Sequence, residues 1–105
     1  MIKEANAVYT GGNIWLFYGE LDDGTYFLTD DNGWTQILNA DPSNLEESTY
    51  YDWQLQHLVR EITGDERIKF CNDLLDYIRD NPDRDGGMSE QEIEVYRTWF
   101  KSDDY

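Results

Sequence analysis

The spacing of apolar residues changes once along the chain, near Pro42, and this change constrains the fold more than any other feature. Before Pro42, short runs of aromatic and β-branched residues alternate with turn signals. Asp23-Gly24 and Asn32-Gly33 separate such runs, and these dipeptides favour hairpins because both residues tolerate positive φ. We therefore predict that residues 1–40 form an antiparallel β-meander of three to four strands.

After Pro42 the apolar residues recur at helical spacing, which predicts three helices in residues 41–105. Capping boxes mark two of the helix starts, Ser43 with Glu46 and Ser89 with Glu92. Gly64 is expected to end the first helix, and the second is expected to end before Pro82. The expected buried stripes are Tyr51, Leu55, Leu58 and Ile62; Ile68, Cys71, Leu75 and Ile78; and Ile93, Tyr96 and Phe100.

Length and element order together predict one α+β domain spanning residues 1–105, with the helices packed on one face of the sheet. Leu, Ile, Val and Phe account for 23 of the 105 residues. This share exceeds the level of roughly 20% below which highly charged chains remain disordered. A lone Cys71 and the lack of an apolar leader favour a soluble protein of the cytoplasm.

The charge balance is strongly acidic, with 23 Asp and Glu against 8 Lys and Arg and a formal net charge of −15. DNA, RNA and anionic membranes attract basic surfaces and would repel this one. Catalysis by a nucleophile needs a base and an orienting group, yet His57 and Cys71 are single and lie on separate predicted helices. We therefore expect a binding protein rather than an enzyme, without a cofactor.

One segment permits a calcium-binding interpretation. Residues 81–92 resemble an EF-hand loop, with Gly86 at the sharp turn. The first position is Asn rather than Asp, Pro82 follows it, and no second loop is present. A polar turn followed by a capping box explains the same residues without metal, so a calcium-dependent interaction module is the alternative. Its candidate ligands are Asn81, Asp83, Asp85, Ser89 and Glu92.

The acidic residues supply the main functional hypothesis. Asp73, Asp76 and Asp80 follow one face of the second predicted helix, about 4.5 to 6 Å apart along its axis. Phosphates along a DNA strand advance by roughly 3.4 Å, so such a row is a coarse copy of a nucleic-acid backbone. Residues 41–105 contain too few Lys and Arg to neutralise the acidic, solvent-facing side of this helical half.

The hairpin turns are expected to place a second acidic cluster at one end of the sheet. Exposed aromatic residues would add specific anchoring, because Tyr and Trp are enriched in interface hot spots. The further candidates for partner binding are Asp22, Asp23, Asp30, Asp31, Glu46, Glu47, Tyr50 and Trp53.

In size, acidity and aromatic content the whole chain resembles the small inhibitor proteins that phages and other mobile genetic elements direct against host defence enzymes. The resemblance rests on no motif, and no residue role follows from it. It implies an anti-CRISPR or anti-restriction inhibitor whose partner is a basic nucleic-acid-handling protein, such as a CRISPR effector. A second alternative is a mobile-element adaptor that uses the aromatic face of its sheet. The target and oligomeric state are left open.

Overall fold

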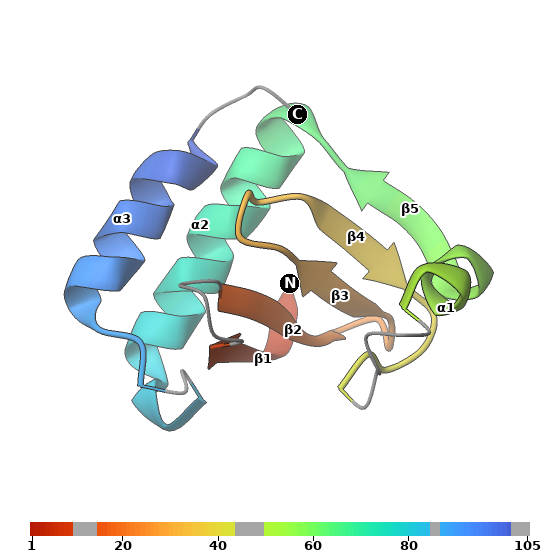
Figure 1. The fold of residues 1–105 in the computed structure, drawn as a ribbon, viewed down its shortest axis with the longest axis horizontal. Coiled ribbons are helices and arrows are strands. Elements are labelled where there is room, and N and C mark those ends of the chain that lie inside the picture. Colours follow the sequence, from red (N-terminus) through yellow and green to blue (C-terminus); the bar gives the residue numbers. More distant parts are fainter. Residues whose placement is uncertain (10–14, 44–49, 85–86, 102–105) are drawn as a thin grey trace.

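The computed structural model describes residues 1–9, 15–43, 50–84 and 87–101. Within these residues, five strands form one antiparallel sheet of order β1-β2-β3-β4-β5. Two long helices lie side by side against one face of the sheet (Figure 1). The elements are β1 (Ile2–Tyr9), β2 (Trp15–Leu21), β3 (Tyr26–Thr29), β4 (Thr35–Leu38), α1 (Tyr50–His57), β5 (Leu58–Ile62), α2 (Gly64–Asp80), the 3-10 helix η2 (Pro82–Arg84) and α3 (Glu90–Phe100).

The α+β class is confirmed, and residues 1–40 form the predicted meander with the four strands β1 to β4, but the sheet has one strand more than the three to four predicted. The additional strand is β5, which the sequence pattern placed in the first helix. Leu58 and Ile62 are four residues apart, and this spacing puts two side chains on one face in a helix and in a strand alike. Pairing with β4 selects the strand. Gly64, with φ of 61°, begins α2 instead of ending the first helix.

A single core fills the space between the sheet and the two long helices. The predicted stripe of α3 is confirmed, since Ile93, Tyr96 and Phe100 are buried. In α2 the predicted residues Cys71, Leu75 and Ile78 are buried, and Leu74 is buried in addition, whereas Ile68 is only partly buried. The sheet contributes alternate residues of its strands, as expected when one face is covered. The sheet residues of this core are Ala5, Ala7, Trp15, Phe17, Phe27, Ile37 and Ile62.

The opposite sheet face is partly buried near β4. Leu28 and Gln36 are cross-strand partners on that face, and both are buried, as is Leu38. Tyr18, next to Leu28 in the register, is half-buried. Less of the sheet face proposed for an adaptor is therefore exposed than the sequence pattern indicated.

Candidate binding surfaces

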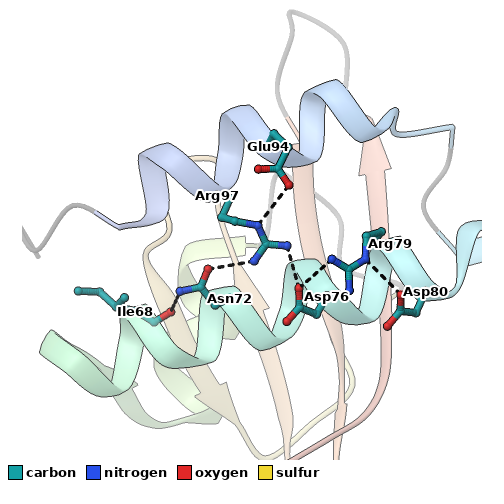
Figure 2. Close-up of polar contacts among 7 residues, drawn as sticks. All are labelled: Ile68, Asn72, Asp76, Arg79, Asp80, Glu94 and Arg97. Atoms are coloured by element: carbon teal, nitrogen blue, oxygen red, sulfur yellow. Dashed lines mark hydrogen bonds and ion pairs between the residues drawn. The ribbon is translucent and has the colours of Figure 1, made fainter.

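The acidic row on α2 is paired with cations of the same chain. Lys69 Nζ lies 2.9 Å from Asp73 Oδ2, and Arg79 Nε lies 3.2 Å from Asp80 Oδ1. Asp76 Oδ1 accepts a hydrogen bond of 2.8 Å from Arg97 Nη2, which reaches across from α3 (Figure 2). Each carboxylate of this row therefore has a cation beside it, although residues 41–105 as a whole contain more acidic than basic residues.

Arg97 is the centre of this network. Its guanidinium also donates to Asn72 Oδ1 at 3.1 Å and lies 3.5 Å from Glu94 Oε1. Its side chain is 17% exposed, whereas the Asp76 side chain is 46% exposed. The pair joins α2 to α3 through a charge-assisted hydrogen bond, which is stronger than one between neutral groups.

The two acidic turns lie at opposite ends of the sheet, so the prediction of one cluster is wrong. Asp22 and Asp23 follow β2, whereas Asp30 and Asp31 follow β3. Successive turns of an antiparallel meander alternate between the two ends, because each strand reverses the chain direction. Figure 1 shows the two turns on opposite sides of the sheet. A partner that contacts one end does not automatically reach the other.

We call the first of these regions the acidic end, defined by Glu4, Glu20, Asp22, Asp23 and Asp41. Asp22 and Asp23 are exposed. Asp23 Oδ1 accepts hydrogen bonds from the Thr25 backbone N–H at 2.9 Å and from the Thr25 hydroxyl. These bonds lower the pKa of Asp23, which keeps it ionised. Among the described residues, no Lys or Arg forms an ion pair with Asp22, Asp23 or Asp41.

Two hollows flank the acidic end. One, of about 220 Å³, is lined by Glu4, Glu20 and Asp41 together with Tyr18 and Tyr26. Glu4 and Glu20 face one another across β1 and β2, and Arg84 and Lys3 pair with them respectively.

The other hollow, of about 360 Å³, has an apolar part that includes Met1, Val59 and Phe70. Its charged lining residues are Asp22, Asp23, Arg60 and Glu66. The acidic end therefore combines concentrated carboxylates with apolar surface.

The turn after β3 uses its acidic residues to hold its own backbone. Asp30 Oδ1 accepts the N–H groups of Asn32 and Trp34, both at 2.9 Å. Partial burial raises the pKa of Asp30 above its ordinary value, although these hydrogen bonds act in the opposite direction. Asp31 is half-buried. This turn offers less accessible charge than the acidic end.

An aromatic groove of about 290 Å³ opens at the same end of the sheet as Asp30 and Asp31. Its β1–β2 side is the ring pair Tyr9 and Trp15, with centroids 5.3 Å apart. Its α3 side is the pair Tyr96 and Trp99, with centroids 5.0 Å apart. Tyr9 and Trp99 are 48% and 55% exposed, whereas Trp15 and Tyr96 are buried. The lining residues are Tyr9, Trp15, Gln91, Glu92, Val95, Tyr96 and Trp99.

Glu92 lines the aromatic groove and is hydrogen-bonded to Trp15 and to the helix cap at Ser89. Its Oε2 accepts a hydrogen bond of 2.9 Å from Trp15 Nε1, and its Oε1 accepts one of 3.1 Å from the Ser89 N–H. With the Ser89 hydroxyl accepting from the Glu92 N–H, this completes the predicted capping box. The hydrogen bond from Trp15, helped by those with Ser89, lowers the pKa of Glu92.

Two of the other candidate calcium ligands, Asn81 and Asp83, lie where α2 ends and η2 follows. Asn81 Nδ2 donates to the Tyr77 carbonyl at 2.8 Å at the end of α2, and Asp83 is exposed. Within residues 1–9, 15–43, 50–84 and 87–101, no group of three or more His, Cys, Asp and Glu residues has the geometry to hold a metal ion. Asp85 lies outside the described residues.

The remaining sequence candidates contribute less to these surfaces. Trp53 is half-buried and its ring lies 4.8 Å from that of His57. His57 Nδ1 lies 2.8 Å from Asn39 Oδ1, and Cys71 is buried, which raises the pKa of its thiol. Glu46 and Glu47 lie outside the described residues, and with Glu46 the predicted capping box between Ser43 and Glu46 does too. The Tyr50 side chain is not described either.

Comparison with known proteins found no matching family model, no matching curated protein and no matching solved structure. Across the described part of the chain, none of the helices has both the length and the apolar character needed to span a membrane.

Proposed function

We propose that this chain is an acidic inhibitor protein that binds a basic nucleic-acid-handling enzyme, such as a CRISPR nuclease or a restriction enzyme, in the cytoplasm of a bacterial host. It blocks that enzyme by occupying the groove that would otherwise hold DNA or RNA. The observation that carries the proposal is the acidic end, where five carboxylates gather: Lys3 and Arg84 pair with two of them, and Arg60 and the N-terminal amine lie near Asp23 without an ion pair to it.

The spacing of these carboxylates suits a cationic groove. Glu4 and Glu20 are cross-strand partners, which places their Cβ atoms about 5 Å apart. Asp22 and Asp23 are adjacent in the turn that follows. Phosphates of one nucleic-acid strand are separated by roughly 3.4 Å along the axis, and consecutive Cα atoms such as those of Asp22 and Asp23 are about 3.8 Å apart. The turn therefore presents its two carboxylates at a comparable spacing, whereas Glu4 and Glu20 are paired with Arg84 and Lys3.

Holding like charges together has a cost that favours a functional explanation. Opposed carboxylates destabilise a strand pair, and a high net charge destabilises the compact state. The ion pairs of Glu4 and Glu20 are exposed, and such pairs contribute about 0 to 1 kcal/mol. The same charges would accelerate association with a basic partner and make binding sensitive to salt.

The test compares two double variants, each of which changes the formal net charge from −15 to −13. Asp22→Asn with Asp23→Asn alters the acidic end, and Asp30→Asn with Asp31→Asn alters the opposite turn. The readout is inhibition of DNA cleavage by purified CRISPR and restriction nucleases at several salt concentrations. For the inhibited enzyme, the first variant should weaken inhibition at least tenfold and the second less than threefold.

Two results would contradict the proposal. One is equal weakening by the two variants, because inhibition would then follow total charge rather than the acidic end. The other is inhibition that does not decrease when DNA or guide RNA is added before the protein. The second result would exclude competition for the nucleic-acid groove.

A further inference from the structure

The aromatic groove combines two features that attract an organic cation. Rings of Tyr9 and Trp99 stand exposed on its two sides, and Trp15 and Tyr96 lie beneath them. A cation within about 6 Å of a Tyr or Trp ring is attracted by the negative face of the ring. Four rings around one hollow supply this attraction from more than one direction.

The charge around the groove is negative. Glu92 lines it as a carboxylate whose two oxygens already accept N–H donors, and this fixes the orientation of the charge. Burial raises the pKa of the Tyr96 phenol, and the charges of Asp31 and Glu92 raise it further. Of these two carboxylates, Glu92 lines the groove itself. An anion would be repelled there, and a neutral apolar group would gain nothing from the charges.

We propose that the aromatic groove binds an arginine side chain of a protein partner. A guanidinium is planar, stacks on aromatic faces and donates several hydrogen bonds in its own plane. It can lie against Trp99 or Tyr9 while its N–H groups point toward the Glu92 carboxylate. A volume of about 290 Å³ accommodates the guanidinium with its three-carbon stem. The site is separate from the acidic end and does not depend on the proposed inhibitor function.

The experiment uses N-acetyl-arginine N-methylamide as the probe, with the citrulline analogue as a neutral control of the same shape. Tetramethylammonium tests for a preference for a rounder cation. Binding to the full chain is followed by NMR through the indole Nε1–H resonances of its tryptophans. The arginine compound should shift the Trp15 and Trp99 resonances more than those of Trp34 and Trp53, and the citrulline compound should bind at least tenfold more weakly.

Two variants test the residues that carry the proposal. Trp99→Ala should weaken binding of the arginine probe at least tenfold, while Trp34→Ala, which removes an indole of 40% exposure outside the groove, should leave it unchanged. Glu92→Gln removes the charge, and its single amide oxygen keeps one of the two hydrogen bonds, that from the Ser89 N–H or that from Trp15 Nε1–H. It should weaken binding of the arginine probe and leave that of the citrulline probe unchanged.

Equal binding of the arginine and citrulline compounds would overturn the proposal, as would tighter binding of tetramethylammonium or full binding by a folded Trp99→Ala variant. These outcomes are independent of the nuclease assay. Loss of inhibition in the Asp22 and Asp23 double variant with no arginine binding would leave the acidic end as the functional surface. Arginine binding without any nuclease inhibition would leave the groove as a site and reject the inhibitor function.

Discussion

The two turns with a positive-φ glycine at the ends of β3 differ in what surrounds them. Gly24 in the acidic end has φ of 87°, and a Cβ at this position would have no heavy atom within 4 Å. Gly33 lies at the opposite end of the sheet, where the aromatic groove opens, and has φ of 84°. A Cβ added at this position would lie 2.8 Å from Arg67 Nη1 and 3.0 Å from Phe100 Cδ1. The same kind of dipeptide, Asp or Asn followed by Gly, therefore occurs in an open, charged turn at one end of the sheet and in a turn packed against helices at the other end.

The largest expected effect follows from this difference. Substituting Gly33→Ala combines positive-φ strain of about 1 to 2 kcal/mol with overpacking of about 1 to 3 kcal/mol, so about 3 kcal/mol of stability should be lost. Gly24→Ala should lose about 1 kcal/mol, because strain alone acts. Urea unfolding of both variants measures the difference. Equal losses would mean that the turn before Trp34 is not packed as the structure has it, and Gly33→Val should be worse than Gly33→Ala.

Local features of the fold could be predicted from the sequence because short-range chemistry determines them. The meander follows from the dipeptides Asp23-Gly24 and Asn32-Gly33, and the start of α3 follows from Ser89 and Glu92. The strand β5 could not be predicted, because the spacing of Leu58 and Ile62 suits a helix as well as a strand. Its formation depends on pairing with β4, a contact between segments separated by α1.

The binding surfaces were harder to predict than the fold, since they depend on contacts between distant residues. The sequence pattern indicates that Asp76 is a free carboxylate, whereas in the structure Arg97, 21 residues later, lies beside it. Lys69 four residues before Asp73, and Arg79 next to Asp80, were visible signals of neutralisation. Nothing in the sequence links Trp15 with Glu92, which are 77 residues apart. The alternation of turns in a meander, by contrast, is a rule that separates the two acidic turns without a structure.

A smaller effect distinguishes the two ends by pH. The pKa of Asp30 is raised above the ordinary value of 3.8, chiefly by burial, whereas that of Asp23 is lowered by hydrogen bonds from Thr25. A raised pKa means that the folded state binds the proton more tightly, so the contribution of Asp30 to stability falls as pH rises from 3.8 through its folded pKa. The contribution of Asp23 is present above pH 3.8 and is lost as pH falls through its lower, folded pKa.

Urea unfolding of the wild type, Asp30→Asn and Asp23→Asn, from below pH 3.8 to above the folded pKa of Asp30, measures the contribution of each carboxylate to the free energy of unfolding. The difference between wild type and Asp30→Asn should shift in favour of the wild type as pH falls toward 3.8. The difference between wild type and Asp23→Asn should shift against the wild type below 3.8. Comparing each variant with the wild type cancels the titration of the other carboxylates, provided that they do not interact with the altered site. Shifts of the same sign in both variants would contradict the distinction between the two ends.

The smallest expected effect concerns calcium. The candidate calcium loop, residues 81–92, has contacts at both ends of the sheet. Arg84 near its start pairs with Glu4 of the acidic end, and Glu92 at its last position accepts a hydrogen bond from Trp15 of the aromatic groove. Bidentate calcium binding through Glu92 would compete with the hydrogen bonds from Trp15 and Ser89, which already orient the two oxygens of the carboxylate. We expect millimolar calcium to leave Trp fluorescence and Tm unchanged in the wild type and in Glu92→Gln alike. A calcium-induced fluorescence change that Glu92→Gln abolishes would show that the loop and the groove form one metal-dependent site, and the separation of the two ends would then fail.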